Sequence, residues 1–308
     1  MKRGGPKNIV ASVQARLVER SRELGVEHQL TLARFGGERL LYRLSKSEFA
    51  DRFILKGAAL LLMWLGEPIR PTKDVDLLGF GDTSAEALTH VFVQLCAIES
   101  PDDGLTFMPD SVHVEAIRED QEYGGMRVKL MAMLGNVRIP LQVDVGAGDA
   151  VVPPPEILDY PGLLDLPRAR LRAYRPETSI AEKTEAMVRL ALANSRMKDF
   201  FDIHRLAETR TFDGETMRLA VAATFTRRGI EIPSERPLAL TSEFADNPQK
   251  KVQWVAFVRR TRRPQLDDLS AIITTLDRFL WPVLQAAARG ELWPRIWSNG
   301  GPWKEPSL

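Results

Sequence analysis

The chain has 308 residues, of which 44% are hydrophobic and 27% charged, and its formal net charge is +1. This composition is typical of a globular protein of one large or two ordinary domains, and it excludes a uniformly basic nucleic-acid coat. The single cysteine, Cys96, excludes a disulfide framework and a cysteine-based zinc site, and is expected to be a small buried residue. No apolar run approaches about 18 residues, so neither a membrane span nor a signal peptide is predicted and the protein is expected in the cytoplasm.

Two amphipathic helices are predicted at the N-terminus, over residues 8–24 and 28–45. In both, apolar residues recur at helical spacing, and the arginines and glutamates are expected on the outer faces. The second helix is expected to break near Gly36-Gly37. We interpret residues 1–45 as a helical extension that packs against the core.

The stretch FILKGAALLLMWLGEPIRPTKDVDLLG, residues 53–79, predicts a strand, a glycine turn, an apolar helix, a loop and a second strand. The second strand carries Asp74 and Asp76, which point to one face, while Val75 and Leu77 point into the core. Two adjacent like charges cost free energy unless a cation neutralises them. A divalent metal that carries a nucleoside triphosphate is the commonest reason to build such a pair.

A helix and three strands are predicted next, with a turn-rich loop at residues 101–110 between them. The helix covers residues 83–99, and the strands cover residues 112–117, 126–134 and 137–145. Gly135-Asn136 is typical of a tight hairpin turn between the last two strands. Strands and helices in this order indicate an α/β or α+β catalytic core, which we place at residues 46–152.

The third of these strands ends with Asp144, just before a glycine-rich turn. Leu141, Val143 and Val145 share one face of this strand, and Asp144 lies on the other face. A carboxylate in this position is a candidate third metal ligand or general base. Many strands, however, end in a solvated aspartate without a function.

The run Pro153-Pro154-Pro155 indicates a boundary, because consecutive prolines continue neither a helix nor a sheet. We predict a mostly helical C-terminal domain at residues 153–308. Its later helices are expected at residues 212–228, 239–259 with a break near Pro248, and 264–289. Residues 291–308, with three tryptophans, are expected to fold back or to lie extended.

Lys183 lies in a predicted helix over residues 178–194, within the apolar stripe formed by Ile180 and Met187. An inward-facing lysine needs a partner, because burying its charge alone is expensive. A triphosphate or the aspartates could supply that partner. Alternatively, the stem of the lysine lies along the edge of the stripe with its ammonium in water.

Asp199 and Asp202 lie three residues apart on the next predicted helix, so they are neighbours on or beside its inward face. His204 falls on a different flank and is expected to be a surface or capping histidine. The sequence indicates no zinc constellation and no serine or cysteine triad.

Two basic stretches are candidates for contact with nucleic acid: Arg168 to Arg175, and Lys250 to Arg263. The second also contains Trp254 and Phe257. Basic residues that alternate with aromatics can bind phosphate backbones and stack on bases. A solvated amphipathic helix would show the same pattern, so both interpretations stay open.

Several segments in a fixed order resemble one family. They are a FILKGAALL turn, a KDVDL strand, a VDVG strand end, an IAEKTEAMVRL helix and a MKDFFDIHRL helix, with GGERLLYRLSKSEFADRFILKGA as the lead-in. Over roughly residues 30–210 the chain resembles the AbiEii family of nucleotidyltransferase toxins, which includes the mycobacterial MenT group. The C-terminal helices match this family only in general character.

The resemblance implies an α+β fold, with a DNA-polymerase-β-like nucleotidyltransferase core followed by a helical domain. It implies the toxin of a toxin–antitoxin pair, often tied to phage defence, with a cognate AbiEi-like antitoxin as partner. Such toxins use Mg²⁺ or Mn²⁺ to transfer a nucleotide from an NTP to RNA, typically the 3′ end of tRNA, which blocks aminoacylation. No DNA or membrane partner is expected.

The resemblance also assigns residues. Its Asp-x-Asp pair falls on Asp74 and Asp76 as metal ligands and catalytic residues, with Asp144 as a weaker third ligand. Its glycine turn falls on Gly57 and Ala58, with Lys56 beside it, and these residues are expected to bind the nucleotide. Ala58 lacks the hydroxyl of a Gly-Ser turn, so contact there must come from backbone N–H groups.

The family's lysine matches Lys183, and its Lys-Asp-x-x-Asp helix matches Lys198, Asp199 and Asp202. Lys183 is expected to neutralise phosphate charge. Asp199 is expected in a catalytic role and Asp202 in nucleotide binding, either by orienting Lys183 or by contacting the base or acceptor. The site is therefore expected to draw on both domains.

Two other functions fit the same residues. The acceptor could be a small molecule or a protein hydroxyl instead of RNA. A non-catalytic module that binds an antitoxin would also keep the fold, but its signature would be loss of Asp74 or Asp76, and both are present.

Overall fold

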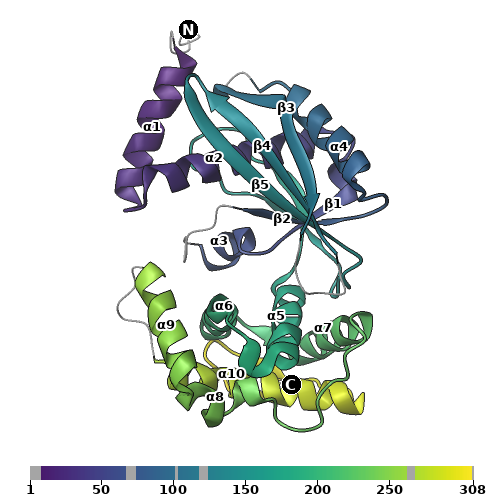
Figure 1. Cartoon of the computed structure of the whole chain (residues 1–308). Helices are drawn as coiled ribbons and strands as arrows, with labels where there is room; N and C mark the ends of the chain where they lie inside the picture. Colours follow the sequence, from purple (N-terminus) through teal and green to yellow (C-terminus); the bar gives the residue numbers. More distant parts are fainter. Residues whose placement is uncertain (1–7, 67–73, 101–102, 118–123, 262–267, 307–308) are drawn as a thin grey trace. The chain divides into compact units, whose positions relative to one another are not determined.

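The computed structural model describes residues 8–66, 74–100, 103–117, 124–261 and 268–306 (Figure 1). It divides into two compact units, each described here by itself. Unit 1 consists of Met1–Met63, Pro71–Gly148 and Glu156–Ala173; unit 2 consists of Trp64–Arg70, Asp149–Pro155 and Tyr174–Leu308. None of the described helices is long and apolar enough to cross a membrane.

Unit 1 is built on a seven-stranded sheet with the order β3-β4-β5-β2-β1-β7-β6. Its strands are β1 (Phe53–Lys56), β2 (Val75–Gly79), β3 (Leu105–Ala116), β4 (Met126–Leu134), β5 (Val137–Ala147), β6 (Glu156–Asp159) and β7 (Arg170–Ala173). The central pair β2–β5 is parallel, whereas β1–β2 and β4–β5 are antiparallel. The expected hairpin is confirmed: Leu134 pairs with Val137 across a turn in which Gly135 has φ +62°.

Strand β3 begins earlier than predicted, because residues 105–110 were expected in a loop. Leu105 and Phe107 are buried while Thr106 and Met108 are exposed, which is the period-two pattern of a half-buried strand. The ladder with β4 is irregular between Met108 and His113. This irregularity hides the strand in the sequence, where Pro109 and Asp110 are typical of a turn.

Two strands, β6 and β7, follow the proline run at which a mostly helical part was predicted to start. Leu55 of β1 pairs in parallel with Ala173 of β7, which extends the sheet of unit 1. Leu171 and Ala173 are buried, so burial of their apolar side chains supports this pairing. The chain therefore returns to the sheet before the helices of unit 2 begin.

The helices of unit 1 pack mainly on one face of the sheet. They are α1 (Ile9–Glu23), α2 (His28–Lys46) and α4 (Ala85–Ala97), while α3 (Ala59–Leu65) and a short 3₁₀ turn (Ala50–Arg52) flank β1. Helix α2 lies against β5 and β7, and α4 lies against β3. Ser84 caps α4 by accepting a hydrogen bond from the Ala87 N–H, and burial raises the pKa of the half-buried Cys96 thiol on this helix to about 11.

The expected break in α2 at Gly36-Gly37 is wrong, because the helix runs unbroken from His28 to Lys46. A Cβ at Gly36 would lie 2.8 Å from Leu141 Cδ2, and one at Gly37 would lie 3.2 Å from Val75 Cγ2. The two glycines therefore let the helix approach the sheet closely instead of interrupting it. This contact also shows that Val75 and Leu141 face α2.

The charged residues of α2 are not all on its outer face, as was expected. Arg39, Arg43 and Glu38 are at most 4% exposed. Asp103, which is fully buried, accepts hydrogen bonds from Arg39 Nε at 3.0 Å and from Arg43 Nη1 at 2.7 Å. The two guanidinium groups can be buried because each donates hydrogen bonds to a carboxylate and to a backbone carbonyl.

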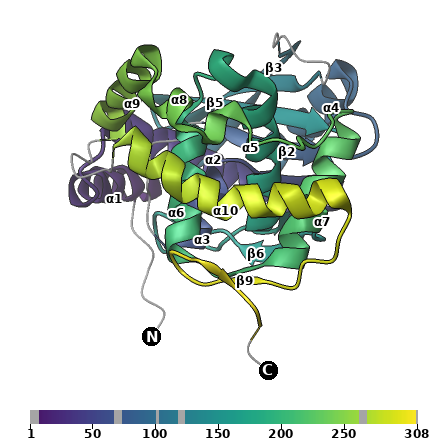
Figure 2. The same ribbon diagram turned by 90° about the horizontal axis from the view of Figure 1, so that it is seen from below.

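Unit 2 is helical, and Figure 2 shows α10 running across it. Helix α10 packs on α6, α7 and α8, and α9 packs on α6 and α8. The helices are α5 (Pro176–Leu190), α6 (Met197–Thr209), α7 (Gly214–Arg227), α8 (Ser242–Asp246), α9 (Pro248–Thr261) and α10 (Leu269–Arg289), with 3₁₀ turns at Ala191–Ala193 and Leu238–Leu240. The expected break near Pro248 is confirmed, because α9 begins at this proline.

The C-terminal tail folds back onto unit 2, which is one of the two arrangements expected. Three short strands, β8 (Phe212–Asp213), β9 (Ile296–Trp297) and β10 (Trp303–Lys304), form a small sheet. Trp297 is fully buried and donates its Nε1–H to the Ala207 carbonyl at 2.7 Å, and Trp303 stacks on Phe279. Tryptophan burial with a satisfied N–H fixes this tail.

Candidate functional site

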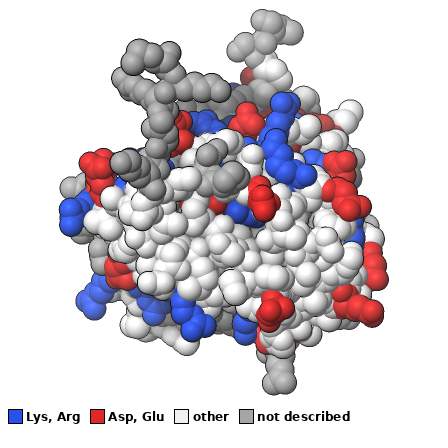
Figure 3. Space-filling model, turned by 90° about the horizontal axis from the view of Figure 1, so that it is seen from above, with Lys and Arg blue, Asp and Glu red and all other residues white. Residues whose placement is uncertain are grey.

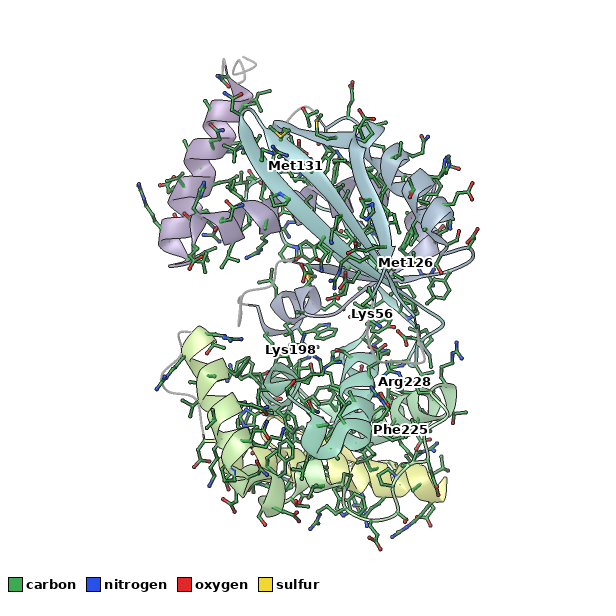
Figure 4. The ribbon with its side chains drawn as sticks, viewed as in Figure 1. Lys56, Met126, Met131, Lys198, Phe225 and Arg228 are labelled. Atoms are coloured by element: carbon green, nitrogen blue, oxygen red, sulfur yellow. The ribbon has the colours of Figure 1, made fainter. Side chains whose placement is uncertain are left out.

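The sheet of unit 1 places four charged residues opposite one another on neighbouring strands. Arg127 of β4 pairs with Asp144 of β5, Asp144 with Asp76 of β2, and Asp76 with Lys56 of β1. Residues paired in this way point to the same face of a sheet. We call Arg127, Asp144, Asp76 and Lys56 the charged row. In Figure 4, Lys56 and Met126, the neighbour of Arg127, lie toward the lower end of the sheet, and Met131 lies toward the other end.

The charged row lies on the face of the sheet that α2 does not cover. Val75 and Leu77 are buried on either side of Asp76, as the alternation predicted, and Val143 and Val145 are buried on either side of Asp144. Val75 faces α2, so Asp76 must face the opposite side. Asp74 is exposed and directly precedes β2. The parallel β2–β5 pairing brings Asp144 beside Asp76, as the third-ligand prediction required.

The turn after β1 approaches the row closely at one point. Gly57 has φ +74°, and a Cβ built there would lie 1.9 Å from Asp76 Oδ2 and 2.7 Å from Asp76 Cβ. Both the positive φ and the missing Cβ are therefore required at this position. As a result, the backbone of the turn lies directly against one carboxylate of the predicted Asp74–Asp76 pair.

The next residues of this turn carry backbone donors. The carbonyls of Gly57 and Ala58 accept hydrogen bonds from the N–H groups of Leu60 and Leu61, in the first turn of α3. For the N–H groups of Ala58 and Ala59, by contrast, the part of the chain that the structure describes supplies no hydrogen-bond acceptor. Ala58 lacks a hydroxyl, so these N–H groups are what the turn offers to an anion.

Asp144 is held by two neighbours in the sheet. Arg127 donates to it in a bidentate arrangement, Nε to Oδ1 at 2.9 Å and Nη2 to Oδ2 at 2.8 Å, and Gln142 Nε2 lies 3.3 Å from Oδ1. The hydrogen bond to Asp144 raises the pKa of Arg127, and the charges of Asp144, Asp74 and Glu115 add to this effect. Arg127 was not among the predicted site residues. The two-residue Gly135-Asn136 turn would have revealed it, since counting outward from that turn pairs residue 127 with residue 144.

The carboxylates of this face can be compared with what a divalent metal needs. In the described part of the chain, no group of three or more His, Cys, Asp or Glu side chains is placed to hold a metal ion. Mg²⁺, however, is usually bound by one or two carboxylates together with substrate phosphates and water. Asp74 and Asp76 fit that donor set. Asp144 fits it less well, because both of its oxygens already accept hydrogen bonds from Arg127.

A second charged cluster lies in unit 2, between α5 and the start of α6. Lys183 Nζ donates to Asp199 Oδ1 at 2.8 Å and to Asp202 Oδ2 at 2.9 Å, and Arg196 Nε donates to Asp199 Oδ2 at 2.6 Å. We call these four residues the Lys183 cluster. Of the alternatives left open for Lys183, the aspartate partners are therefore the ones observed. The structure thus brings together three of the predicted site residues.

The two carboxylates of the Lys183 cluster are completely buried. The side chain of Asp199 is 1% exposed and that of Asp202 is 0% exposed. Burial alone would raise the pKa of Asp199, but the charges of Lys183 and Arg196 outweigh it and lower this pKa to about 2. Because neither carboxylate faces solvent, Asp199 and Asp202 are better placed to orient Lys183 than to contact a nucleotide directly.

Two expectations about unit 2 are changed by the structure. His204 was expected at the surface or at a helix cap, but it lies within α6 and is 6% exposed, because this flank of the helix also faces the interior of unit 2. Trp254 is 4% exposed and packs against Phe257, so this tryptophan is not available for stacking on bases. Lys250 is also buried and donates to the Asn194 carbonyl at 2.7 Å. Arg259 and Arg260 are exposed, and Arg262 and Arg263 lie outside the described residues.

The surface charges give no broad basic field on the face shown in Figure 3. There, lysines and arginines are interspersed with aspartates and glutamates around an uncharged area. The mixed charges on this face accord with the formal net charge of +1.

An α+β fold with paired carboxylates beside a glycine turn is typical of an enzyme that handles phosphate-bearing substrates. The sequence matches the family described as nucleotidyl transferase AbiEii toxin, type IV TA system, over residues 39–286. The chain therefore belongs to the AbiEii family of nucleotidyltransferases, the toxins of type IV toxin–antitoxin systems, and membership implies an antitoxin partner.

Two solved structures from Helicobacter pylori are similar to this chain. One is a candidate nucleotidyltransferase with 16% identity and a TM-score of 0.46, covering 86% of this chain and 98% of its own. The other is JHP933, with 16% identity and a TM-score of 0.43, covering 85% of this chain and 91% of its own. Among curated proteins, the comparison finds no match.

Proposed function

We propose that this toxin transfers a nucleotide from an NTP to RNA, most readily to the 3′ end of tRNA, and so blocks translation. The observation that carries the proposal is the contact of the Gly57 turn with Asp76, where a Cβ would lie 1.9 Å from Oδ2. Such an approach places backbone donors for phosphate beside a carboxylate that can hold the cation of a nucleotide. The antitoxin partner in this proposal is an AbiEi-like protein.

In the proposed reaction, an acceptor hydroxyl attacks the α-phosphate of the NTP and pyrophosphate leaves. Asp74 and Asp76 hold Mg²⁺ or Mn²⁺, which when bound neutralises phosphate charge and stabilises the attacking and leaving oxygens. Lys56, at the end of the charged row, and the N–H groups of Ala58 and Ala59 bind phosphate oxygens. These residues all belong to unit 1.

In unit 2, Lys183 supplies a positive charge to the same reaction, and Asp199 and Asp202 fix the position of its ammonium. Two buried carboxylates on one ammonium, at 2.8 and 2.9 Å, leave that group little freedom to move. A preorganised cation of this kind stabilises developing phosphate charge without reorganisation cost. Asp199 therefore acts through Lys183 in this proposal.

The test uses the purified full chain with each of the four NTPs, labelled at the α-phosphate. Separate reactions contain total tRNA, a protein mixture, or small molecules with hydroxyl groups. We expect label in tRNA, and none after the tRNA has been oxidised with periodate, because oxidation destroys the terminal ribose diol. A chelator of divalent metals should abolish the labelling.

Asp76→Asn should lower the rate more than about a hundredfold, because it removes a charge that holds the metal. The matched control is Asp110→Asn, an exposed aspartate on β3 of the same sheet, which should leave the rate unchanged. Label in the protein or small-molecule pool would overturn the RNA acceptor. Near-normal transfer by Asp76→Asn would overturn the metal role, and absence of label from every pool would favour a non-catalytic antitoxin-binding module.

A further inference from the structure

The pairing of Asp144 with Arg127 raises a question about the third carboxylate of the charged row. Each oxygen of Asp144 accepts a hydrogen bond from the guanidinium, at 2.9 and 2.8 Å, and Gln142 adds a contact at 3.3 Å. In a planar, bidentate pair of this kind, the geometry of the guanidinium matches that of the carboxylate. A metal ion at Asp144 would have to share these two oxygens with Arg127 or displace it.

Arg127 keeps donors beyond those that Asp144 uses. A guanidinium carries five N–H donors, and the pair with Asp144 uses the one on Nε and one on Nη2. In the described ranges, Nη1 has no hydrogen-bond acceptor, and 32% of the side chain is exposed. The remaining donors form a second fork, and such a fork matches the oxygens of a phosphate group.

The position of Arg127 in the sheet suits a phosphate ligand. Its paired neighbour Asp144 lies beside Asp76, against which the Gly57 turn packs. Arg127 and Lys56 occupy the two ends of the charged row, with the two carboxylates between them. A cation at each end can bind the polyanionic tail of an NTP, while the Arg127–Asp144 pair adds no net negative charge to repel it.

We propose that Arg127 binds the phosphate tail of the NTP and that Asp144 positions Arg127 instead of ligating the metal. This inference rests on the proposed function and assigns part of its substrate site. It predicts that Asp144 and Arg127 act as one unit, so that loss of either removes the same contact.

The experiment measures binding without turnover, using the full-length protein and an α,β-methylene NTP with Mg²⁺. Arg127→Gln should weaken this binding about tenfold or more, as loss of a charged hydrogen bond predicts, and should leave binding of the nucleoside monophosphate unchanged. Arg127→Lys keeps the charge without the fork and should fall between Arg127→Gln and the wild type. The matched control is Arg138→Gln, an exposed arginine on β5, which should bind as the wild type does.

Asp144 is tested by a double-mutant cycle and by direct metal binding. Asp144→Asn should weaken NTP-analogue binding, and the variant with both substitutions should bind no more weakly than Arg127→Gln alone. Affinity for Mn²⁺ without nucleotide, measured by electron paramagnetic resonance, should not change in Asp144→Asn. Asp76→Asn should lower that affinity, which tests the metal site of the proposed function separately.

Three results would overturn the inference. The first is NTP-analogue binding by Arg127→Gln at wild-type strength. The second is loss of Mn²⁺ affinity in Asp144→Asn, which would make Asp144 a metal ligand. The third is additive losses in the double variant. If Asp76→Asn still abolishes Mn²⁺ binding and nucleotide transfer in any of these cases, the proposed function stands without this assignment. If the wild type binds no NTP analogue, both fall.

Discussion

The charged row and the Lys183 cluster contain the same kinds of group, two cations and two carboxylates, in opposite surroundings. In the row, the side chains of Arg127 and Asp144 are 32% and 21% exposed. In the cluster, the two aspartates are at most 1% exposed, and a single ammonium bonds to both. The row can therefore exchange partners when a substrate arrives, whereas the cluster holds its lysine in one place.

This difference has an energetic consequence. A buried ion pair loses much free energy when one partner is removed, because the other charge is left without solvent or partner. A partly exposed pair loses little, since water takes over. Replacing one cation by methionine should thus lower the free energy of unfolding more in the Lys183 cluster than in the charged row. Five of the six tryptophans lie in α9, α10 and the C-terminal tail of unit 2, and Trp64 lies near the end of α3, so tryptophan fluorescence reports mainly the unfolding of unit 2.

The largest expected effect is that of Lys183→Met. It leaves Asp199 and Asp202 buried without the ammonium and should lower the free energy of unfolding by about 3–5 kcal/mol. Urea denaturation followed by tryptophan fluorescence measures this loss. Arg127→Met, followed in unit 1 by hydrogen exchange of β4 and β5, should cost only about 1 kcal/mol or less.

Lys198→Met is the matched control for Lys183→Met. Lys198 is an exposed lysine on α6, one residue from Asp199, and its replacement should change stability by less than about 0.5 kcal/mol (Figure 4). If Lys183→Met were as stable as Lys198→Met, the ion pairs of the cluster would not be the constraint that we describe.

Glu38 provides the next comparison, because it is as buried as the cluster carboxylates but has a different pKa. Burial raises its pKa from 4.5 to about 7, although the Leu163 N–H, Arg39 and Arg34 act in the opposite direction. Its Oε2 accepts the Leu163 N–H at 2.8 Å, and within the described ranges no lysine ammonium contacts it as Lys183 contacts Asp199. Direct contact with a cation, more than burial, thus decides the direction of the shift.

Because the folded pKa of Glu38 is raised, its contribution to stability is complete below about pH 4.5 and is lost as the pH rises through about 7. Glu38→Gln cannot ionise, so its stability relative to the wild type should rise by up to about 3 kcal/mol between pH 5 and pH 8. Hydrogen exchange of α2 at several pH values measures this change. Glu48→Gln, at an exposed position just after α2, is the control and should show no such trend. A difference that stays constant with pH would contradict the raised pKa.

The parts of the fold set by local pattern could be predicted from the sequence. Alternation in KDVDLLG fixed the face of Asp76, the Gly135-Asn136 turn fixed the hairpin, and helical spacing placed Lys183 on an inward face. Each of these depends on residues close together in the chain. The same is true of the start of α9 at Pro248.

Features that depend on residues far apart in the chain could not be predicted from local sequence patterns. Arg39 and Arg43 look like outer-face residues by helical spacing. Their burial depends on acceptors far along the chain, above all Asp103, which lies 64 and 60 residues away. The parallel β2–β5 pairing that brings Asp144 beside Asp76 is likewise non-local. Strand β7 pairs with β1 across more than a hundred residues, and β6 pairs only with β7. The four-residue segments of these two strands therefore do not by themselves predict that they join the sheet.

Of the two pH-dependent effects, the smaller is expected from protonation of Asp199. Its pKa is lowered from 3.8 to about 2, so its stabilising contribution is present above about pH 4 and is lost as the pH falls through about 2. This shift corresponds to about 2 kcal/mol. The side chain of Asp199→Asn does not titrate. The difference in free energy of unfolding between this variant and the wild type should therefore narrow by about 2 kcal/mol as the pH falls from 5 to 2. Asp246→Asn, at an exposed site of unit 2, should keep a constant difference. If the stability difference between Asp199→Asn and the wild type also stayed constant with pH, the Lys183 cluster would not hold Asp199 ionised. The cluster would then resemble the charged row, whose groups are partly exposed to solvent.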